Sequence, residues 1–84
     1  MYICEYRIPA CGKFSLSIPD EHIFLGVQPK ANIPFLYIAE KQEARFTHNF
    51  RVANVDEIFE PGKETYIGVF TVDNCTKILF EEVL

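Results

Sequence analysis

Short stretches of alternating or wholly apolar sequence, separated by proline and glycine, fill almost all of the 84 residues. Alternation with a period of two places successive side chains on opposite faces of a strand, so the pattern is typical of half-buried β-structure. A chain of this length forms one domain and buries about 60–65% of the surface that its unfolded form exposes. The sequence therefore predicts one all-β domain over residues 1–84, an antiparallel barrel or two-layer sandwich of six to seven strands with at most one short helix.

The expected strands cover residues 2–8, 13–18, 22–28, 35–39, 45–52, 65–72 and 76–84. We expect the first two to pair as a hairpin, the charged run 40–44 to be a hairpin loop, and Asp73-Asn74 to form a tight turn. The third strand places Ile23, Leu25 and Val27 on one face. The segment 54–59 is the one helix candidate, with Asn54 as its N-cap.

Gly68 lies in the middle of the strongest expected strand, which is rich in β-branched and aromatic residues. A glycine at such a position marks either a bulge that lets a small sheet curl or a place where a ligand or a neighbouring backbone comes close. Both interpretations remain open, and the bulge is the favoured one.

Charge and hydropathy exclude several classes of protein. The formal net charge of −4 argues against general binding of duplex nucleic acid, which needs a basic surface. No run approaches the ~18–20 apolar residues that span a bilayer, and the first residues lack the basic start of a secretory leader. The cysteines are odd in number and form no C-x-x-C pair, so Cys4, Cys11 and Cys75 are expected to be free thiols in a reducing cytosol.

Motifs for catalysis, phosphate-binding loops or zinc ligation do not occur, so we expect no enzyme, no cofactor and no metal site. Two histidines are the remaining candidates. His48 falls between Phe46 and Phe50 on an apolar face, where a satisfied core histidine is the favoured interpretation over a ligand or a base. His22 follows Asp20 and Glu21. These three residues could bind a metal ion, but their preference for turns explains them equally well.

A dense array of hydrogen-bond donors stands out in this acidic chain. Residues at every second position of a strand project together, so Arg45, Thr47, Asn49 and Arg51 form one row, here called the arginine row. Guanidinium groups bind phosphate with two parallel hydrogen bonds, and Asn and Thr bind hydroxyls or base edges. The alternative is a solvated face paired with Glu40, Glu43 or Glu57. Because Arg51 projects outward in this register, Arg51→Ala should abolish ligand binding and cost less than about 0.5 kcal/mol of stability.

Residues 35–39 are apolar on both faces, which predicts a central strand or a subunit contact. A small domain with surplus apolar surface can cover it against a second copy. The sequence therefore predicts a homo-oligomer, a dimer or higher. Tyr37 in this segment and Tyr66 in a later strand are candidates for stacking on a nucleotide base.

Several blocks together resemble a known family. They are the early run from Ile18-Pro19 to Gly26-Val27-Gln28, the stretches "IPFLYI" and "YIGVF", and the closing "ILFEEV". In their order and spacing they resemble a widespread family of small uncharacterised phage and prophage proteins, a domain of unknown function. The resemblance covers nearly the whole chain. It implies a phage-encoded accessory protein expressed in the bacterial host cytoplasm.

The resemblance and the residues together suggest two hypotheses. The first is a counter-defence protein that binds and sequesters a nucleotide-derived host immune signal without catalysis. The ligand-binding residues would be the arginine row together with Tyr37 and Tyr66. The second is an inhibitor or regulator that binds a host defence protein directly, through a sheet edge or an aromatic patch.

Overall fold

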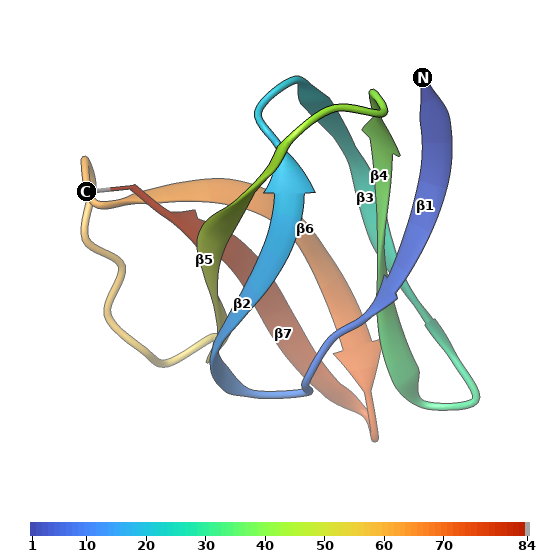
Figure 1. Ribbon diagram of the computed structural model, residues 1–84. Coiled ribbons are helices and arrows are strands. Elements are labelled where there is room, and N and C mark those ends of the chain that lie inside the picture. Colours follow the sequence, from blue (N-terminus) through green and yellow to red (C-terminus); the bar gives the residue numbers. More distant parts are fainter. Residues whose placement is uncertain (84) are drawn as a thin grey trace.

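The computed structural model describes residues 1–83 and contains seven antiparallel strands and no helix within that range. The strands are β1 (Tyr2–Arg7), β2 (Gly12–Pro19), β3 (His22–Lys30), β4 (Ile33–Glu40), β5 (Arg45–Asn54), β6 (Glu64–Val72) and β7 (Cys75–Glu82). The all-β two-layer prediction is confirmed (Figure 1). The strand predicted for residues 76–84 reaches Leu84, which lies outside the described residues.

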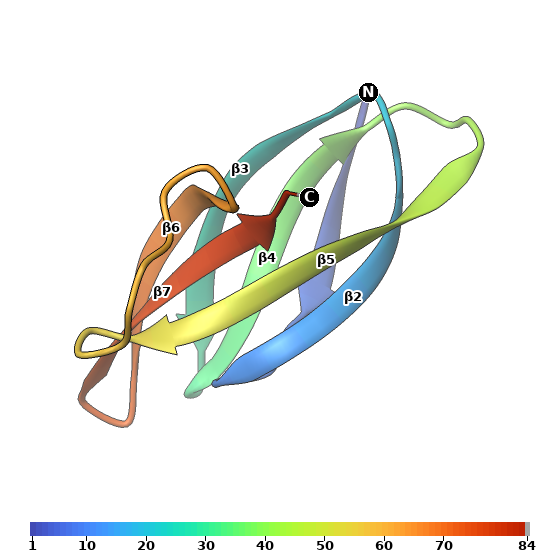
Figure 2. The same ribbon diagram turned by 90° about the vertical axis from the view of Figure 1, so that its left-hand side faces the viewer.

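The strands form two sheets that pack face to face. One sheet has three strands in the order β1-β4-β3, and the other has four in the order β2-β5-β7-β6. In Figure 2 the four-stranded sheet lies in front of the three-stranded sheet, and β3 packs against β6. The core between them consists of Ile8, Ile18, Leu36, Ile38, Phe50, Val52, Phe70, Val72 and Leu79. Apart from Ile8, which follows β1, these residues lie on strands, and those that share a strand occupy alternate positions, as the period-two pattern requires.

The first two strands do not form the expected hairpin. β1 pairs with β4, and β2 pairs with β5, so the chain changes layer between Arg7 and Gly12. Ile8 lies in this crossing segment, and its amide N–H donates to the carbonyl of Pro34 at 3.1 Å, which keeps it beside the first sheet. The hairpin prediction was wrong because alternation shows which side chains face the core and not which strand lies alongside.

The charged run 40–44 is not a hairpin loop either. It leads from β4 in one sheet to β5 in the other, and these two strands do not pair. Glu40 at its start is buried, with 2% of its surface exposed. A buried carboxylate needs partners, and those partners, described below, come from both sheets.

Two hairpins are closed by two-residue turns. Ala31 and Asn32 join β3 to β4, and Asp73 and Asn74 join β6 to β7; all four residues have positive φ, between 51° and 62°. Two consecutive residues with positive φ are typical of the type I′ turn, which matches the twist of a hairpin. The tight turn predicted at Asp73-Asn74 is confirmed.

Both sheets contain a bulge, and the two bulges belong to facing strands. The pairing of β6 with β7 shifts between Tyr66 and Gly68, so the favoured interpretation of Gly68 is confirmed. The pairing of β3 with β4 shifts between Phe24 and Gly26. This second bulge lets Val27 pack on the core, whereas Ile23 and Leu25 point outward. The expectation that these three side chains share one face was therefore wrong.

The helix candidate at 54–59 is a turn and loop. Asn54 is the last residue of β5, and the chain turns at Val55 and Asp56. The apolar side chains that follow are used elsewhere, because Phe59 stacks on Phe80 with the ring centroids 5.3 Å apart. A six-residue segment has no helical stability of its own, so this packing decides its conformation.

The outer face of the three-stranded sheet carries exposed apolar side chains. Ile3 of β1 and Ile23 of β3 are both paired with Ala39 of the central strand β4, so they flank it on either side. Ile3 is 73% exposed, Ile23 54% and Leu25 51%. We call Ile3, Ile23, Leu25 and Ala39 the apolar face. Within residues 1–83, no helix has the length and hydropathy needed to cross a membrane.

Candidate functional site

The arginine row lies on the outer face of β5, as its alternation predicts. Thr47 and Asn49 at its centre are exposed. The Oγ of Ser15, on the neighbouring strand β2, donates to Oδ1 of Asn49 at 2.7 Å. The centre of the row is therefore open to solvent, whereas the two arginines at its ends are held by ion pairs.

Arg45 neutralises the buried carboxylate of Glu40. Its Nη2 lies 3.0 Å from Oε1 of Glu40 and donates to the hydroxyl of Tyr6 at 2.5 Å, while its Nε donates to the carbonyl of Ser17 at 3.0 Å. Tyr6 in turn donates to the other oxygen of Glu40. Burial, together with this hydrogen bond, raises the pKa of Tyr6 to about 12. Arg45 thus joins the two sheets electrostatically.

Arg51 makes a bidentate ion pair with Glu64. Its Nε lies 2.6 Å from Oε2 of Glu64, and its Nη2 donates to Oε1 at 2.8 Å. Nη1 contacts Glu57 at 3.0 Å, and Nη2 also reaches the carbonyl of Ile58 at 3.2 Å. The side chains of Arg51 and Glu64 are only 15% and 8% exposed. The hydrogen bond from Arg51 holds the pKa of Glu64 below its usual range.

These contacts bear on the alternative of a solvated, ion-paired face. Glu40 and Glu57 are partners of the arginines as that alternative held, but Glu43 instead accepts from the backbone N–H of Glu21. Glu64, whose side chain is nearly buried, was not foreseen as a partner. Because Arg51 shields this carboxylate from water, the expectation that Arg51→Ala leaves stability unchanged no longer follows from the structure.

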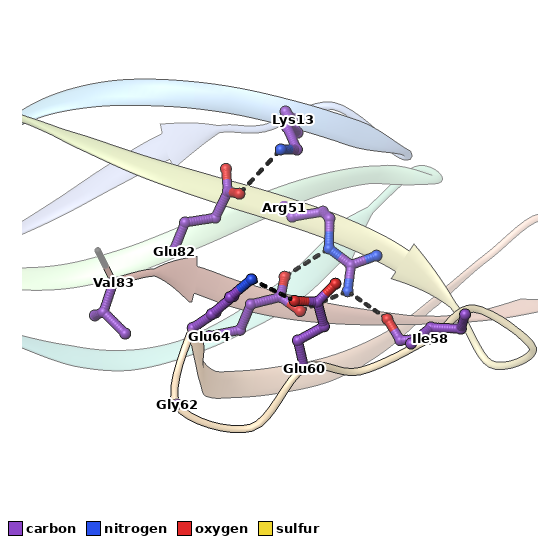
Figure 3. A pocket seen from close by; sticks show the side chains of 9 residues that line it. Lys13, Arg51, Ile58, Glu60, Gly62, Glu64, Glu82 and Val83 are labelled. Atoms are coloured by element: carbon purple, nitrogen blue, oxygen red, sulfur yellow. Dashed lines mark hydrogen bonds and ion pairs between the residues drawn. The ribbon is translucent and has the colours of Figure 1, made fainter.

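A cavity opens beside Arg51, between the outer face of the four-stranded sheet and the loop that precedes β6 (Figure 3). Its volume is about 610 Å³, and we call it the Arg51 pocket. It is lined by Lys13, Arg51, Ile58, Glu60, Gly62, Lys63, Glu64, Glu82 and Val83. The lining holds three cationic and three anionic side chains, so its formal charges cancel.

Two of the three ion pairs in the Arg51 pocket are exposed. Lys13 lies 3.1 Å from Glu82, and Lys63 lies 3.1 Å from Glu60. The lysine side chains are 72% and 76% exposed, in contrast to Arg51. Figure 3 shows Lys13 and Glu82 on one side of Arg51 and Glu60 on the other. The pocket thus combines one nearly buried guanidinium with two exposed ammonium groups.

The two candidate tyrosines do not lie together. Tyr66 is 60% exposed and shares the outer face of the four-stranded sheet with the arginine row, since it pairs with Phe80, which pairs with Arg51. Tyr37 lies on the outer face of the other sheet, where its hydroxyl donates to Glu5 at 2.8 Å. The pairing register therefore places Tyr66, and not Tyr37, on the face that carries the row.

Sequence reasoning missed the lysines of the pocket. Lys13 lies on β2, and its pairing with Arg51 on β5 brings the two side chains to the same face of the sheet. That register was hidden because β2 was expected to pair with the first strand. Lys63 and Glu64 belong to a loop and a strand end whose position depends on the whole fold, so no local signal indicates them.

The cysteines lie away from the Arg51 pocket, and none lines it. Cys4 is partly buried, and Cys11 and Cys75 are exposed. Burial raises the pKa of the Cys4 thiol, which disfavours the reactive thiolate.

Comparison with known proteins found no matching family model, no matching curated protein and no matching solved structure.

Proposed function

We propose that the protein is a non-enzymatic binding protein that holds a nucleotide-derived ligand in the Arg51 pocket. One observation carries the proposal: a cavity of about 610 Å³ lies at the end of the arginine row and is bordered by three cationic side chains. Small-molecule sites usually have volumes of about 300–1,000 Å³. The pocket therefore has room for a nucleotide and donors for its phosphates.

The two exposed lysines supply the phosphate contacts. Exposed ion pairs contribute only about 0–1 kcal/mol each, so a phosphate can replace Glu82 at Lys13 and Glu60 at Lys63 at little cost. Arg51 keeps its pair with Glu64 and forms the fixed wall of the site. Because the carboxylates stay nearby, the affinity should be moderate and should fall with added salt.

The rest of the ligand meets apolar and aromatic surface. Ile58 and Val83 line the Arg51 pocket, and Phe59 stacks on Phe80 beside it. Tyr66 is exposed on the same face and offers a ring for stacking on a base. Such a site holds its ligand through ion pairs and stacking, with no bond broken.

This chemistry agrees with the role that the family resemblance implies. A phage protein in the bacterial host cytoplasm that sequesters a nucleotide-type immune signal needs a pocket and no catalytic groups. In this proposal the protein acts as a counter-defence factor. Each pocket holds one ligand, so the concentration of the protein sets how much signal is sequestered.

Isothermal calorimetry against a panel of cyclic oligonucleotides and ADP-ribose derivatives tests the proposal. We expect one member to give saturable heat, and Lys13→Ala to weaken its binding about tenfold or more. Lys41→Ala is the matched control, since Lys41 is also an exposed lysine paired with a glutamate but does not line the pocket. Folded protein that gives no heat with any member would overturn the proposal.

We assign the apolar face to a second copy of the chain. Ile3 and Ile23 flank Ala39 symmetrically, and the exposed Glu5–Lys30 pair on the same face, with the two atoms 2.7 Å apart, carries both signs of charge. A face with these features is complementary to itself under a two-fold rotation. A dimer formed this way leaves the Arg51 pocket of each copy open on the opposite side of the sandwich.

The alternative function, direct binding to a host defence protein, would use the same apolar face. A pull-down from infected cells separates the two. Release of a small molecule on denaturation supports sequestration, whereas a stoichiometric host protein that is lost in Ile23→Glu supports the alternative.

A further inference from the structure

Two histidines from different sheets meet at the corner where the chain passes from β2 to β3. His22 is the first residue of β3, in the three-stranded sheet, and His48 belongs to β5, in the four-stranded sheet. Their ring centroids are 5.1 Å apart, with the ring planes at 85°. No local motif links the two histidines, because they are far apart in the chain.

Each ring has its Nδ1 engaged by an oxygen that accepts hydrogen bonds. Nδ1 of His22 lies 2.7 Å from the carbonyl of Pro19, and Nδ1 of His48 lies 2.8 Å from Oε2 of Glu81. A carbonyl or a carboxylate oxygen fixes the proton on the nitrogen that faces it. In the neutral rings, Nε2 is then left with a free lone pair.

The Nε2 of His48 is buried and has no hydrogen-bond partner within residues 1–83. A buried polar atom without a partner is costly, and in native proteins such an atom calls for an explanation. The nearest charged group is the carboxylate of Asp20, whose Oδ1 is 3.8 Å away. A lone pair that faces a carboxylate is the arrangement that a bound cation would satisfy.

We propose that this corner binds a divalent transition-metal ion of the zinc class. The Nε2 atoms of His22 and His48 and the carboxylate of Asp20 are the ligands, and water completes the coordination. Glu81 is a positioning residue, because it holds the Nδ1 proton of His48 and so fixes the tautomer. A carboxylate behind a metal-bound histidine is the usual support for such ligands.

The spacing of the groups fits a metal site that closes on binding. One ligand atom from each of His22, His48 and the positioning residue Glu81 lies within 4.8 Å of the others, and Oδ1 of the third ligand, Asp20, lies 3.8 Å from Nε2 of His48. Donors on a common tetrahedral zinc, each about 2.0–2.2 Å from the ion, are roughly 3.3 Å apart. The exposed Asp20 side chain turns to close the remaining distance to Nε2 of His48, while His22 keeps its Nδ1 contact with the Pro19 carbonyl.

The position between the layers gives the ion a structural consequence. His22 and His48 belong to opposite sheets, so a shared ion would link the sheets at an edge of the sandwich. Small domains have little core to stabilise them and often add such a link. Binding to the folded chain alone raises stability according to the concentration of free metal.

Zinc alone is the probe that tests this site. The background is a Cys4→Ser/Cys11→Ser/Cys75→Ser variant, so that thiols cannot contribute. We expect calorimetry and native mass spectrometry to find one zinc per chain. The melting temperature should rise when zinc is added and return to its metal-free value when a chelator removes the zinc. Cobalt in place of zinc should give the visible absorption of a tetrahedral site. Glu81→Gln should weaken binding about 10- to 100-fold without removing it.

His22→Ala is the deciding variant, because this residue is at a strand end and its loss should leave the metal-free fold intact by circular dichroism. We expect it to remove saturable zinc binding. Asp20→Asn is a second variant with an exposed side chain, which keeps the test valid if His22→Ala does not fold. Absence of saturable binding in the cysteine-free protein would overturn the proposal, as would unchanged binding in folded His22→Ala.

Discussion

Arg51 on β5 and Glu64 on β6 form an ion pair, with 2.6 Å between Nε and Oε2, although β7 lies between their strands. The guanidinium passes over the ring of Phe80 on β7, 5.4 Å from its centroid. One ion pair thus fastens three strands of the four-stranded sheet. It also closes the inner wall of the Arg51 pocket.

Arg51→Ala should lower the free energy of unfolding by about 2–4 kcal/mol, because it leaves the nearly buried Glu64 carboxylate without its partner. Urea unfolding measures this loss. The matched control is Lys63→Ala, which breaks an exposed pair in the same pocket and should change stability by less than about 1 kcal/mol. Equal effects of the two substitutions would contradict the structural difference between the pairs.

Acid should remove the contribution of Glu64 to stability. The pKa of Glu64 is held below its ordinary value of 4.5 in the folded protein, chiefly by the hydrogen bond from Arg51. Its contribution is therefore fully present above pH 4.5 and is lost as the pH falls through the lower, folded-state pKa. Unfolding curves of the native chain and of Glu64→Gln should differ at neutral pH and converge in acid. A constant difference would show that charge plays no part.

Gly68→Ala should destabilise the sandwich by about 1–3 kcal/mol, because an added Cβ would lie 2.9 Å from Cγ1 of Val27 in the facing sheet. Val27→Ala removes the methyl group that would collide. The double variant should therefore be more stable than the sum of the two single effects predicts, by at least about 0.5 kcal/mol. Strict additivity in thermal melts would show that the two sheets are not in close contact here.

Ile23→Glu should convert a dimer into a monomer, because it places a charge within the proposed contact. The side chain is 54% exposed, so the fold should be retained. Val69→Glu is the matched control, since Val69 is 50% exposed and lies on the other sheet. Light scattering at tens of micromolar is the measurement. A monomeric native chain, or a monomer in both variants, would contradict the assignment.

The alternating pattern was sufficient to predict the strands and most of the buried positions, since burial of one face imposes the period of two. It could not predict which strands pair, because β1 satisfies the same pattern beside β4 as beside β2. Nor could it place Ile23, since the bulge at Gly26 changes which side of β3 faces the core.

The candidate site was partly accessible from the sequence. The row from Arg45 to Arg51 follows from local alternation and lies where it was expected. Glu64, which fixes Arg51, and Lys13, which borders the pocket, are brought there by pairings that span the chain. Contacts of this kind depend on topology and leave no local signal.

The separation of β1 from β2 has a consequence for how the chain reaches its native state. The β3–β4 and β6–β7 hairpins close across two residues and can form early, within microseconds. β1 must wait for β4 and β2 for β5, and both pairings close loops that span a large part of the sequence. Such non-local closure places folding of this chain on the millisecond-to-second scale of β-sandwiches. Until then the apolar edges of β4 and β5 are unprotected, so an N-terminal strand supplied by another copy could pair there during synthesis.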